Sequence, residues 1–190
     1  MGQLLTGFFF LSLTAQAATS VNLDIDKSTV KFNAVGRPSL LNIKGEGTGV
    51  DGSVTQTGGD IIGDIKFKLE KLGTGIGTRD EHMKKKYLEV EKYPVADLSI
   101  TSFHLPTEFL KSTKFEKKEV PFKGTLSLHG VKKEVAGTVD LSRTDKTFDG
   151  IAKVPIKMSD FNIVTPKFAG IEVKDDVQIE VDIKGNVLGK

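Results

Sequence analysis

Cysteine is absent from the 190 residues of this chain. These residues therefore contain no disulfide, no thiol nucleophile, no cysteine ligand for a metal and no cysteine that a lipid could modify. Tryptophan is also absent, and only two tyrosines accompany the 12 phenylalanines. An apolar interior must consequently be built from aliphatic side chains and phenylalanine, which leaves few interior groups able to hydrogen-bond a polar ligand.

The chain has almost no excess of charge of either sign. Lysine and arginine number 27 against 25 aspartates and glutamates, which gives a formal net charge of +2. A dedicated nucleic-acid-binding protein would show a concentrated basic face, so we expect no nucleic-acid partner. Hydrophobic residues make up 38% of the chain and charged residues 27%. These proportions and the length are typical of one globular domain with a full core.

The first 17 residues have the features of a secretory signal peptide. An apolar run from Leu4 to Leu13 precedes Ala15-Gln16-Ala17, which has the small-x-small form of a cleavage site. The run is shorter than the ~20 apolar residues that a membrane-spanning helix needs. No lysine or arginine precedes it, although a basic segment is usual there. We expect a signal peptide over 1–17, a single domain over 18–190 and a periplasmic or secreted location; a buried N-terminal element is the alternative.

Most of the remaining chain alternates between apolar and polar residues with a period of two. Ile65, Phe67 and Leu69, for example, alternate with charged residues within the segment 61–72. Such alternation predicts antiparallel strands with one buried and one solvated face, whereas parallel strands would be apolar on both faces. About eight strands are expected. The other alternating runs are 21–25, 30–34, 98–105, 120–128, 135–141, 148–158 and 177–183.

Several interruptions of the strand pattern have specific explanations. The apolar phase slips by one residue at 101–102, which predicts a β-bulge. The Gly- and Thr-rich segment 44–59 predicts either a thin strand with a hairpin turn at Asp51–Gly52 or a flexible loop. A lysine-rich loop is expected over 107–118, and His129–Gly130 is expected to form a turn.

Two architectures accommodate such strands: a sandwich of two sheets and a closed up-and-down barrel. Small residues recur on the apolar faces, where a sandwich core would require large side chains; they are Gly124, Gly137, Gly150 and Ala152. A barrel with space inside, or with sharply bent strands, tolerates small residues at such positions. The strand pattern by itself leaves both architectures open.

One heavily charged segment has the periodicity of a helix instead of a strand. Thr78 and Glu81 have the spacing of a capping box, in which each side chain accepts from the backbone N–H of the other residue. Met83 and Tyr87 follow at i and i+4, which gives a narrow apolar stripe. The sequence therefore predicts a short helix over about 78–90.

Arg79, Asp80 and His82 are the residues of this helix whose side chains could take part in catalysis or ligand binding. Asp80 and His82 lie two positions apart and do not share a helix face, so a catalytic dyad is not expected. In one interpretation Asp80 contributes to capping and His82 is a surface residue. In the other, Arg79 and His82 lie at a pocket rim and meet a polar or anionic head group. The lysines at 84–86 are more typical of a solvated face than of a membrane-binding patch.

Motifs of known enzymes are absent from the sequence. It contains no nucleophile elbow, no phosphate-binding glycine loop and no dinucleotide fingerprint. Glycines alternate at Gly73, Gly75 and Gly77 without forming the helix-opening GxGxxG pattern. His104 and His129 fall on separate strands without metal-ligand spacing and are expected to be structural. We expect neither an enzyme, nor a metal site, nor a cofactor.

Four elements in sequence order resemble the bacterial YceI-like family, a lipocalin-like family of secreted isoprenoid-binding proteins. The resemblance extends over essentially the whole mature chain. A distinctive loop over 162–170 follows the last of these elements. The four are Thr78-Arg79-Asp80 with His82, Val90-Glu91-Lys92-Tyr93-Pro94, the strand and turn from Phe122 to Val131, and Ser159-Asp160-Phe161.

The resemblance implies an all-β, antiparallel up-and-down barrel of eight strands, with the helix covering one end and a long apolar chain held inside. The implied function is a periplasmic carrier of an isoprenoid or fatty-chain amphiphile, with Arg79, Asp80 and His82 as rim candidates for its head group. The apolar strand faces supply the expected cavity lining: Phe32, Ile65, Phe67, Leu69, Leu98, Ile100, Phe122, Leu126, Leu128, Val154, Ile156, Ile179 and Val181.

Two further functions are alternatives to the carrier. One is a stress-responsive envelope scaffold whose barrel is filled by its own side chains. The other, which has weaker support, is an enzyme acting on a bound lipid. Transient contact with a membrane surface and formation of a homodimer are additional hypotheses about partners.

Overall fold

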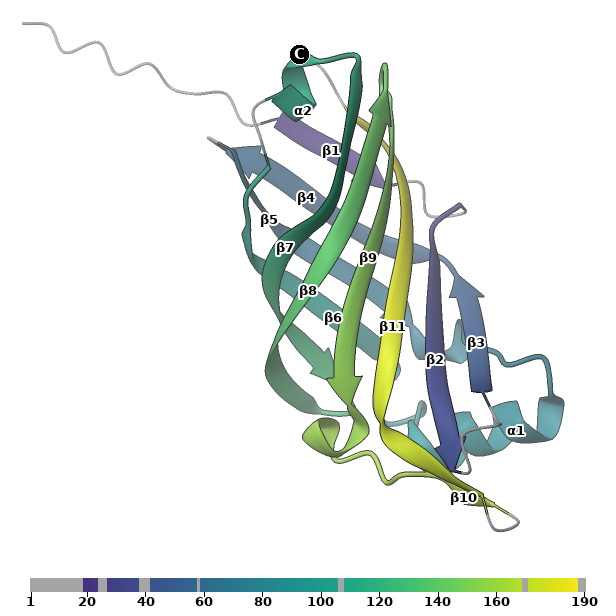
Figure 1. Ribbon diagram of the computed structural model, residues 1–190. Coiled ribbons are helices and arrows are strands. Elements are labelled where there is room, and N and C mark those ends of the chain that lie inside the picture. Colours follow the sequence, from purple (N-terminus) through teal and green to yellow (C-terminus); the bar gives the residue numbers. More distant parts are fainter. Residues whose placement is uncertain are drawn as a thin grey trace, which may run out of the picture.

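A single antiparallel sheet contains all the strands of the described residues in the computed structural model (Figure 1). The structure describes residues 19–23, 27–37, 42–57, 59–105, 108–168 and 171–187; the expected signal peptide lies outside them. The strands are β1 (Thr19–Leu23), β2 (Thr29–Arg37), β3 (Asn42–Thr48), β4 (Val50–Thr57), β5 (Asp60–Lys68), β6 (Val95–Phe103), β7 (Lys114–Leu128), β8 (Val131–Thr144), β9 (Thr147–Lys157), β10 (Lys167–Phe168) and β11 (Ile171–Val187).

The sheet curls into a half-barrel, which confirms the predicted all-β, lipocalin-like class. Its strand order is β1-β4-β5-β6-β7-β8-β9-β11-β2-β3, with β10 on β11. At one end β1 also pairs with β11, with Val21 opposite Val187, so the curled sheet closes on itself there. The eleven strands exceed the expected eight because β3 and β4 both form within 42–57 and β10 adds a two-residue pair.

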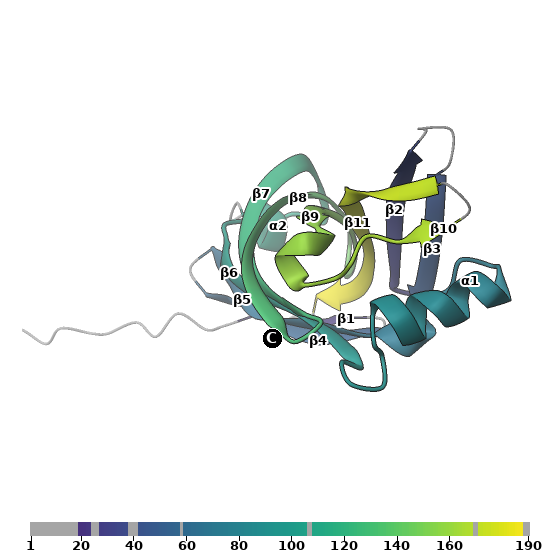
Figure 2. The same ribbon diagram turned by 90° about the horizontal axis from the view of Figure 1, so that it is seen from below.

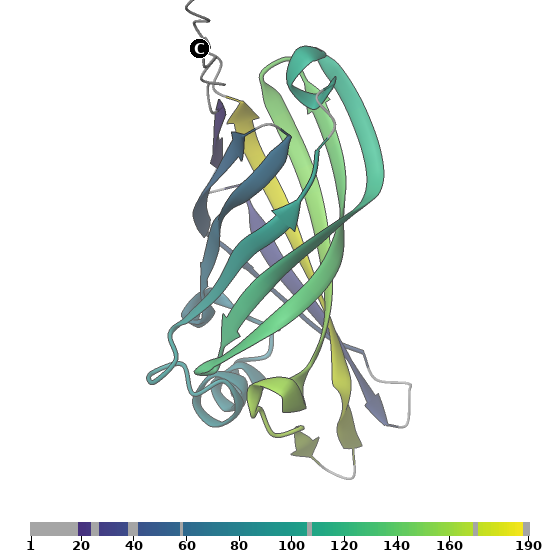
Figure 3. The same ribbon diagram turned by 90° about the vertical axis from the view of Figure 1, so that its left-hand side faces the viewer.

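The other end of the sheet is open, because β2 and β3 diverge from β5 and β6 (Figure 1). β3 pairs with β2, and one bridge between Glu46 and Gly73 connects its outer edge to the chain before α1. Helix α1 (Gly77–His82) and the π-helical turn η2 (Met83–Tyr87) lie at this end. Seen from the side, α1 and β10 are at one end of the barrel and α2 (Glu108–Lys111) is at the other (Figure 3).

The predicted helix is present but differs in its length and its cap. It begins at Gly77, and its π-helical turn η2 ends at Tyr87, three residues before the predicted end. The predicted capping box is wrong: the N-cap residue is Ile76, and it makes no side-chain capping hydrogen bond. Thr78 lies inside the first turn, where its hydroxyl cannot serve as the N-cap acceptor.

The predicted β-bulge and the predicted turn at His129–Gly130 are both confirmed. The register of β6 against β7 shifts between Ile100 and Ser102, as a bulge requires. His129 and Gly130 have φ values of 51° and 76°, the paired left-handed conformation of a tight hairpin turn. The prediction of a hairpin turn at Asp51–Gly52 is wrong, because both residues lie within β4. The strands are instead interrupted at Gly49, where φ is 93°.

The segment 107–118 is not a loop along its length. Helix α2 forms at its start, and β7 begins at Lys114. Phe109 of α2 is buried against the rings of Phe115 and Phe148, in edge-to-face contacts with centroid distances of 5.3 and 6.3 Å. The short helix is therefore fixed by aromatic packing, which a lysine-rich composition conceals.

Phenylalanine rings fill some of the space that glycines leave on the apolar faces. Phe32 on β2 is paired with Gly45 on β3, where an added Cβ would lie 2.2 Å from the Phe32 ring. Phe122 is likewise paired with Gly137, where the corresponding distance is 2.8 Å. Gly137 thus accommodates a ring from the neighbouring strand, so a small residue on the apolar face does not by itself indicate space inside the barrel.

Two short 3-10 helices complete the fold. η1 (Leu69–Lys71) follows β5 and leads to the segment before α1, and η3 (Met158–Phe161) follows β9. η3 ends at Asn162, whose φ of 55° is left-handed, and the chain then turns back toward β10. Both helices lie toward the open end of the barrel, so they help to shape the entrance to its interior (Figure 2).

Candidate functional site

A cavity of about 850 Å³ occupies the open half of the barrel. Its volume lies within the range of about 300–1,000 Å³ that is typical of small-molecule sites. Strands β2, β3, β5, β6, β7, β9 and β11 form its walls, and α1, η2 and the chain around β10 contribute its rim. The closed half of the barrel is packed with side chains, among them Phe103 against Phe122 at 6.3 Å and the cluster around Phe109.

Most of the predicted lining residues face this cavity. Ile100 and Phe122 do not line it. Phe122 packs on Phe103 in the filled half of the barrel, and Ile100 lies opposite Gly63 and Gly124 beside the bulge. The predicted residues that do line the cavity are Phe32, Ile65, Phe67, Leu69, Leu98, Leu126, Leu128, Val154, Ile156, Ile179 and Val181.

Several lining residues were not predicted. Some lie within the strands expected over 30–34, 148–158 and 177–183 but were not named among the predicted lining residues: Ala34, Ala152, Val177 and Ile183. Val173 lies four residues before the last of these runs. Others follow η3, where no periodicity exists; Ile163, Pro166 and Lys167 are examples. From the helical segment come Thr78, Met83, Lys86, Tyr87 and Leu88, together with Thr74 and Ile76 before it.

The three rim candidates have different positions. Arg79 and His82 both line the mouth of the cavity, whereas Asp80 is not among the lining residues. Asp80 Oδ1 instead accepts hydrogen bonds from the Thr74 backbone N–H, at 2.7 Å, and from the Thr74 hydroxyl. The Thr74 hydroxyl hydrogen bond holds the pKa of Asp80 below its ordinary value of 3.8, and the positive charges of Lys84 and Arg79 act in the same direction.

Thr74 also positions Arg79. The Arg79 Nε donates to the Thr74 hydroxyl oxygen at 2.8 Å, and Nη2 donates to the Thr74 carbonyl oxygen at 2.9 Å. Because the Thr74 hydroxyl gives its one proton to Asp80, its oxygen is an acceptor toward Arg79. Three residues thus form one network that orients the guanidinium at the cavity mouth.

His129 links three segments beneath the rim. It is 8% exposed; its Nδ1 lies 3.0 Å from the Phe161 carbonyl oxygen and its Nε2 lies 2.8 Å from Glu89 Oε2. The Tyr93 ring contacts it edge-on at 4.6 Å. These contacts connect the β7–β8 turn with η3 and with the chain after η2. His129 therefore has a structural role. His104, by contrast, is exposed and lies 3.1 Å from Asp60.

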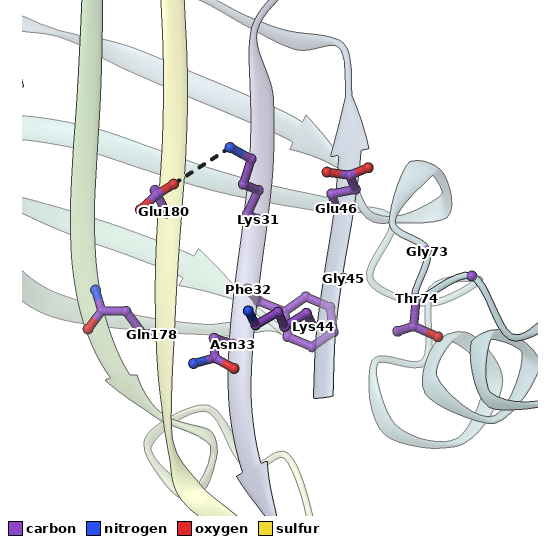
Figure 4. A pocket seen from close by; sticks show the side chains of 11 residues that line it. Lys31, Phe32, Asn33, Lys44, Gly45, Glu46, Gly73, Thr74, Gln178 and Glu180 are labelled. Atoms are coloured by element: carbon purple, nitrogen blue, oxygen red, sulfur yellow. Dashed lines mark ion pairs between the residues drawn. The ribbon is translucent and has the colours of Figure 1, made fainter. Parts of the chain in front are cut away.

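A second hollow of about 570 Å³ lies on the outer face of β11, β2 and β3 (Figure 4). Its lining side chains other than Phe32 are polar, and Lys31 forms ion pairs with Asp182 at 2.6 Å and with Glu180 at 3.7 Å. The Asp182 hydrogen bond raises the pKa of Lys31. Phe32 and Thr74 line both hollows, so the Phe32 ring lies at the boundary between the polar groove and the apolar cavity.

The described residues include neither a candidate metal site nor a candidate membrane-spanning helix. They contain no group of three or more histidine, aspartate or glutamate side chains that could hold a metal ion. Among them there is also no helix with the length and apolar character needed to cross a membrane.

Comparisons with known proteins agree with this architecture. The family model described as the YceI-like domain matches residues 21–185. A polyisoprenoid-binding domain from Saccharophagus degradans, implicated in plant cell wall breakdown, has 16% identity and a TM-score of 0.69, covering 92% of this chain and 100% of that one. Burkholderia cenocepacia BcnA has 19% identity and a TM-score of 0.68, covering 86% and 99%.

A third similar structure is the Campylobacter jejuni YceI protein, with 18% identity and a TM-score of 0.61, covering 79% of this chain and 88% of that one. No curated protein matches the chain significantly. At these identities the similarity to solved structures establishes the fold, while the ligand must be inferred from this chain's own residues.

Proposed function

Because the chain belongs to the YceI-like family, we propose that it is a periplasmic carrier that holds an isoprenoid or similar long-chain amphiphile in its barrel cavity. The observation that supports this most directly is the cavity of about 850 Å³ with apolar strand walls and a polar rim at one end. An amphiphile has the same division between an apolar chain and a polar head. The polyisoprenoid-binding domain of similar fold supports the same ligand class.

The apolar wall supplies the affinity for the chain of the ligand. Transfer of an apolar chain from water into the cavity is favourable by about 0.8 kcal/mol for each CH₂ group. A ligand that comes from a membrane leaves an equally apolar interior, so this contribution nearly cancels. The head group and the rim then determine net transfer, which suits a carrier that loads and unloads better than a permanent store.

The cavity also bears on the alternatives. A scaffold with a filled barrel is disfavoured, since only the half around Phe103, Phe109 and Phe122 is packed solid. An enzyme acting on the lipid gains no support from Asp80, because its carboxylate is turned to Thr74 and is not part of the lining. The periplasmic location rests on the signal-peptide pattern of residues 1–17.

Lipid analysis of the protein tests this function. Protein purified from its own host should carry an extractable long-chain amphiphile, identified by mass spectrometry, in near-equimolar amount. Delipidated protein should take up one equivalent of a polyprenol, observed in a native mass spectrum. Ligand-free protein from the host that also fails to take up polyprenols or fatty acids would exclude the carrier function.

A further inference from the structure

Both ring nitrogens of His129 face oxygen atoms that accept hydrogen bonds. Nδ1 lies 3.0 Å from the Phe161 backbone carbonyl oxygen, and Nε2 lies 2.8 Å from Glu89 Oε2. A carbonyl oxygen carries no proton, so Nδ1 must be the donor in the first contact. A neutral imidazole then has no second N–H, and an ionised carboxylate has no proton to give. The arrangement is therefore complete only when one additional proton lies between Nε2 and Glu89 Oε2.

This additional proton can be exchanged with solvent through Glu89. The His129 side chain is 8% exposed, whereas the Glu89 side chain is 44% exposed. Histidine is the side chain whose charge ordinarily changes between about pH 5 and 8. Loss of the proton leaves the Nε2 lone pair facing the carboxylate at 2.8 Å without a hydrogen bond, which is costly for a buried polar atom. The contact is thus favourable at low pH and is lost as the pH rises.

The chain after η2 supplies this charged partner of His129. Glu89 has a φ of 44°, a left-handed value that non-glycine residues seldom adopt, so the contacts around it must hold it there. Four residues later, the Tyr93 ring packs edge-on against His129 at 4.6 Å, with Lys92 Nζ 4.9 Å from the centre of the tyrosine ring. Leu88, immediately before Glu89, lines the cavity. The contact with His129 therefore fixes a segment of the rim.

η3 supplies the contact with the other ring nitrogen. The Phe161 carbonyl that accepts from Nδ1 lies two residues before Ile163, which lines the cavity. The carboxylate of Asp160, the charged residue of η3, pairs with Lys133 of β8 at 3.6 Å. Both η3 and the helical segment of α1 and η2 lie at the open end of the barrel (Figure 2). His129 thus ties two segments of the cavity mouth to the turn between β7 and β8.

We propose that His129, Glu89 and the Phe161 carbonyl form a proton-dependent latch that controls how long a bound amphiphile stays in the cavity. With the additional proton in place, both rim segments are held and the ligand is retained. As the pH rises and the proton leaves, the Glu89 segment separates from His129, the mouth widens and the ligand dissociates faster. The inference rests on the proposed carrier function and adds the condition under which the carrier unloads.

The latch is tested first without a ligand, by hydrogen–deuterium exchange of the amides in 87–90 and 158–163. Protection factors, which remove the effect of pH on intrinsic exchange, are compared at about pH 5.5 and about pH 8. We expect the protection of both segments in the wild type to fall at least about threefold at the higher pH, which corresponds to one lost hydrogen bond. Unchanged protection would overturn the latch.

Two variants of the pair have opposite expected effects. In Glu89→Gln the side-chain amide can donate to Nε2 of a neutral imidazole, so both nitrogens are satisfied without an additional proton. This variant should keep the low-pH protection at both pH values. His129→Asn cannot reach both partners and should show low protection at both. Reduced protection in Glu89→Gln, which a role in packing alone predicts, would overturn the proton dependence.

Release of tritiated farnesol to phosphatidylcholine vesicles tests the consequence for the ligand. Neither the alcohol nor this lipid changes charge between about pH 5.5 and about pH 8, so a pH dependence comes from the protein. Dissociation from the wild type should be at least about threefold faster at the higher pH. It should be slow at both pH values for Glu89→Gln and fast at both for His129→Asn. His104→Asn is the matched control, because His104 is exposed beside Asp60, and it should keep the wild-type pH dependence.

The outcomes separate this inference from the carrier function. If protection depends on pH but neither farnesol nor a longer polyprenol binds, the carrier function and the role in release are both wrong. If farnesol binds but dissociates at one rate at both pH values, the carrier function stands and the latch is overturned. Loss of the pH dependence in His82→Gln would assign it to His82 at the cavity mouth and would overturn the role of His129.

Discussion

The Asp80 carboxylate accepts a hydrogen bond from the backbone N–H of Thr74, six residues earlier in the chain, at 2.7 Å. This contact fastens the first turn of α1 to the segment that precedes it. The N-cap residue Ile76 has no side chain able to accept a hydrogen bond, so Asp80 takes over the role of anchoring the start of the helix. The same contact holds Thr74 where it orients Arg79.

Replacing Asp80 should therefore loosen the rim. Asp80→Asn removes the charge that strengthens both Thr74 hydrogen bonds, and we expect a loss of about 1 kcal/mol in the free energy of unfolding. Chemical denaturation measures this change. Glu81→Gln is the control, because Glu81 pairs with Lys85 at an exposed position, and its stability should match that of the wild type. Equal stability of both variants would contradict the anchoring role.

The pH dependence of stability provides a separate test of the same contact. Since the pKa of Asp80 is lowered by folding, its contribution is fully present above the ordinary value of 3.8 and is lost as the pH falls through the lower folded pKa. The difference in unfolding free energy between wild type and Asp80→Asn should be constant near neutral pH and shrink below 3.8. A difference that instead grows on acidification would show that Asp80 is not stabilised in its charged form.

A methyl group at Gly45 should destabilise the barrel. Its Cβ would lie 2.2 Å from Phe32 Cε1 and 2.8 Å from the Gly73 carbonyl oxygen. Gly45→Ala is expected to cost about 1–3 kcal/mol, as overpacking does. At Gly77, at the start of α1, an added Cβ would meet nothing within 4 Å. Gly77→Ala should then be neutral or stabilising by up to about 1 kcal/mol; thermal unfolding compares the two, and a harmless Gly45→Ala would refute the packing account.

His129 should matter for stability more than His104. His129→Asn tolerates the left-handed backbone but cannot reach both the Phe161 carbonyl and Glu89, and we expect a loss of about 1–3 kcal/mol. His104→Asn, at an exposed position beside Asp60, should change the free energy of unfolding by less than about 0.5 kcal/mol. Similar losses for the two variants in urea titrations would show that the buried contacts of His129 are not structural.

The sequence predicted the fold well where one residue pattern dictates one geometry. Period-two alternation located the long strands, and the phase slip at 101–102 located the bulge, because a one-residue shift moves every side chain to the other face. It failed at Asp51–Gly52, where a common hairpin pair lies inside β4. The residue types at Asp51 and Gly52 do not determine whether the chain turns there or at Gly49, because the position of the turn depends on which strand pairs with β4.

The site was predictable to the extent that it is made of strands. Phe67, Leu126 and Val181 were located by alternation alone, whereas Lys167 was missed because its place depends on the pairing of β10 with β11. Phe122 shows the limit of alternation: it faces inward as expected, but it lies in the half of the barrel that aromatic rings fill. Pattern gives the face of a strand, and only packing decides which part of that face borders a cavity.

Occupancy of the cavity is tested most directly by a pair of neighbouring residues on β9. Ala152 is 7% exposed and lines the cavity, while Ile151 is 36% exposed and pairs with Asp140 and Asp182 on the outer face. The chain contains no tryptophan, so the emission of Ala152→Trp or Ile151→Trp reports directly whether the new ring is buried or solvated.

The deciding measurement is the uptake of farnesyl phosphate and farnesol by these two variants and the wild type in native mass spectra. We predict that Ala152→Trp, with a buried emission spectrum, lowers the affinity for both probes at least tenfold, because the ring takes up space that the tail needs. Ile151→Trp, with a solvated spectrum, should load like the wild type. If the wild type and both variants load equally, the ligand does not occupy the barrel cavity and the account is wrong.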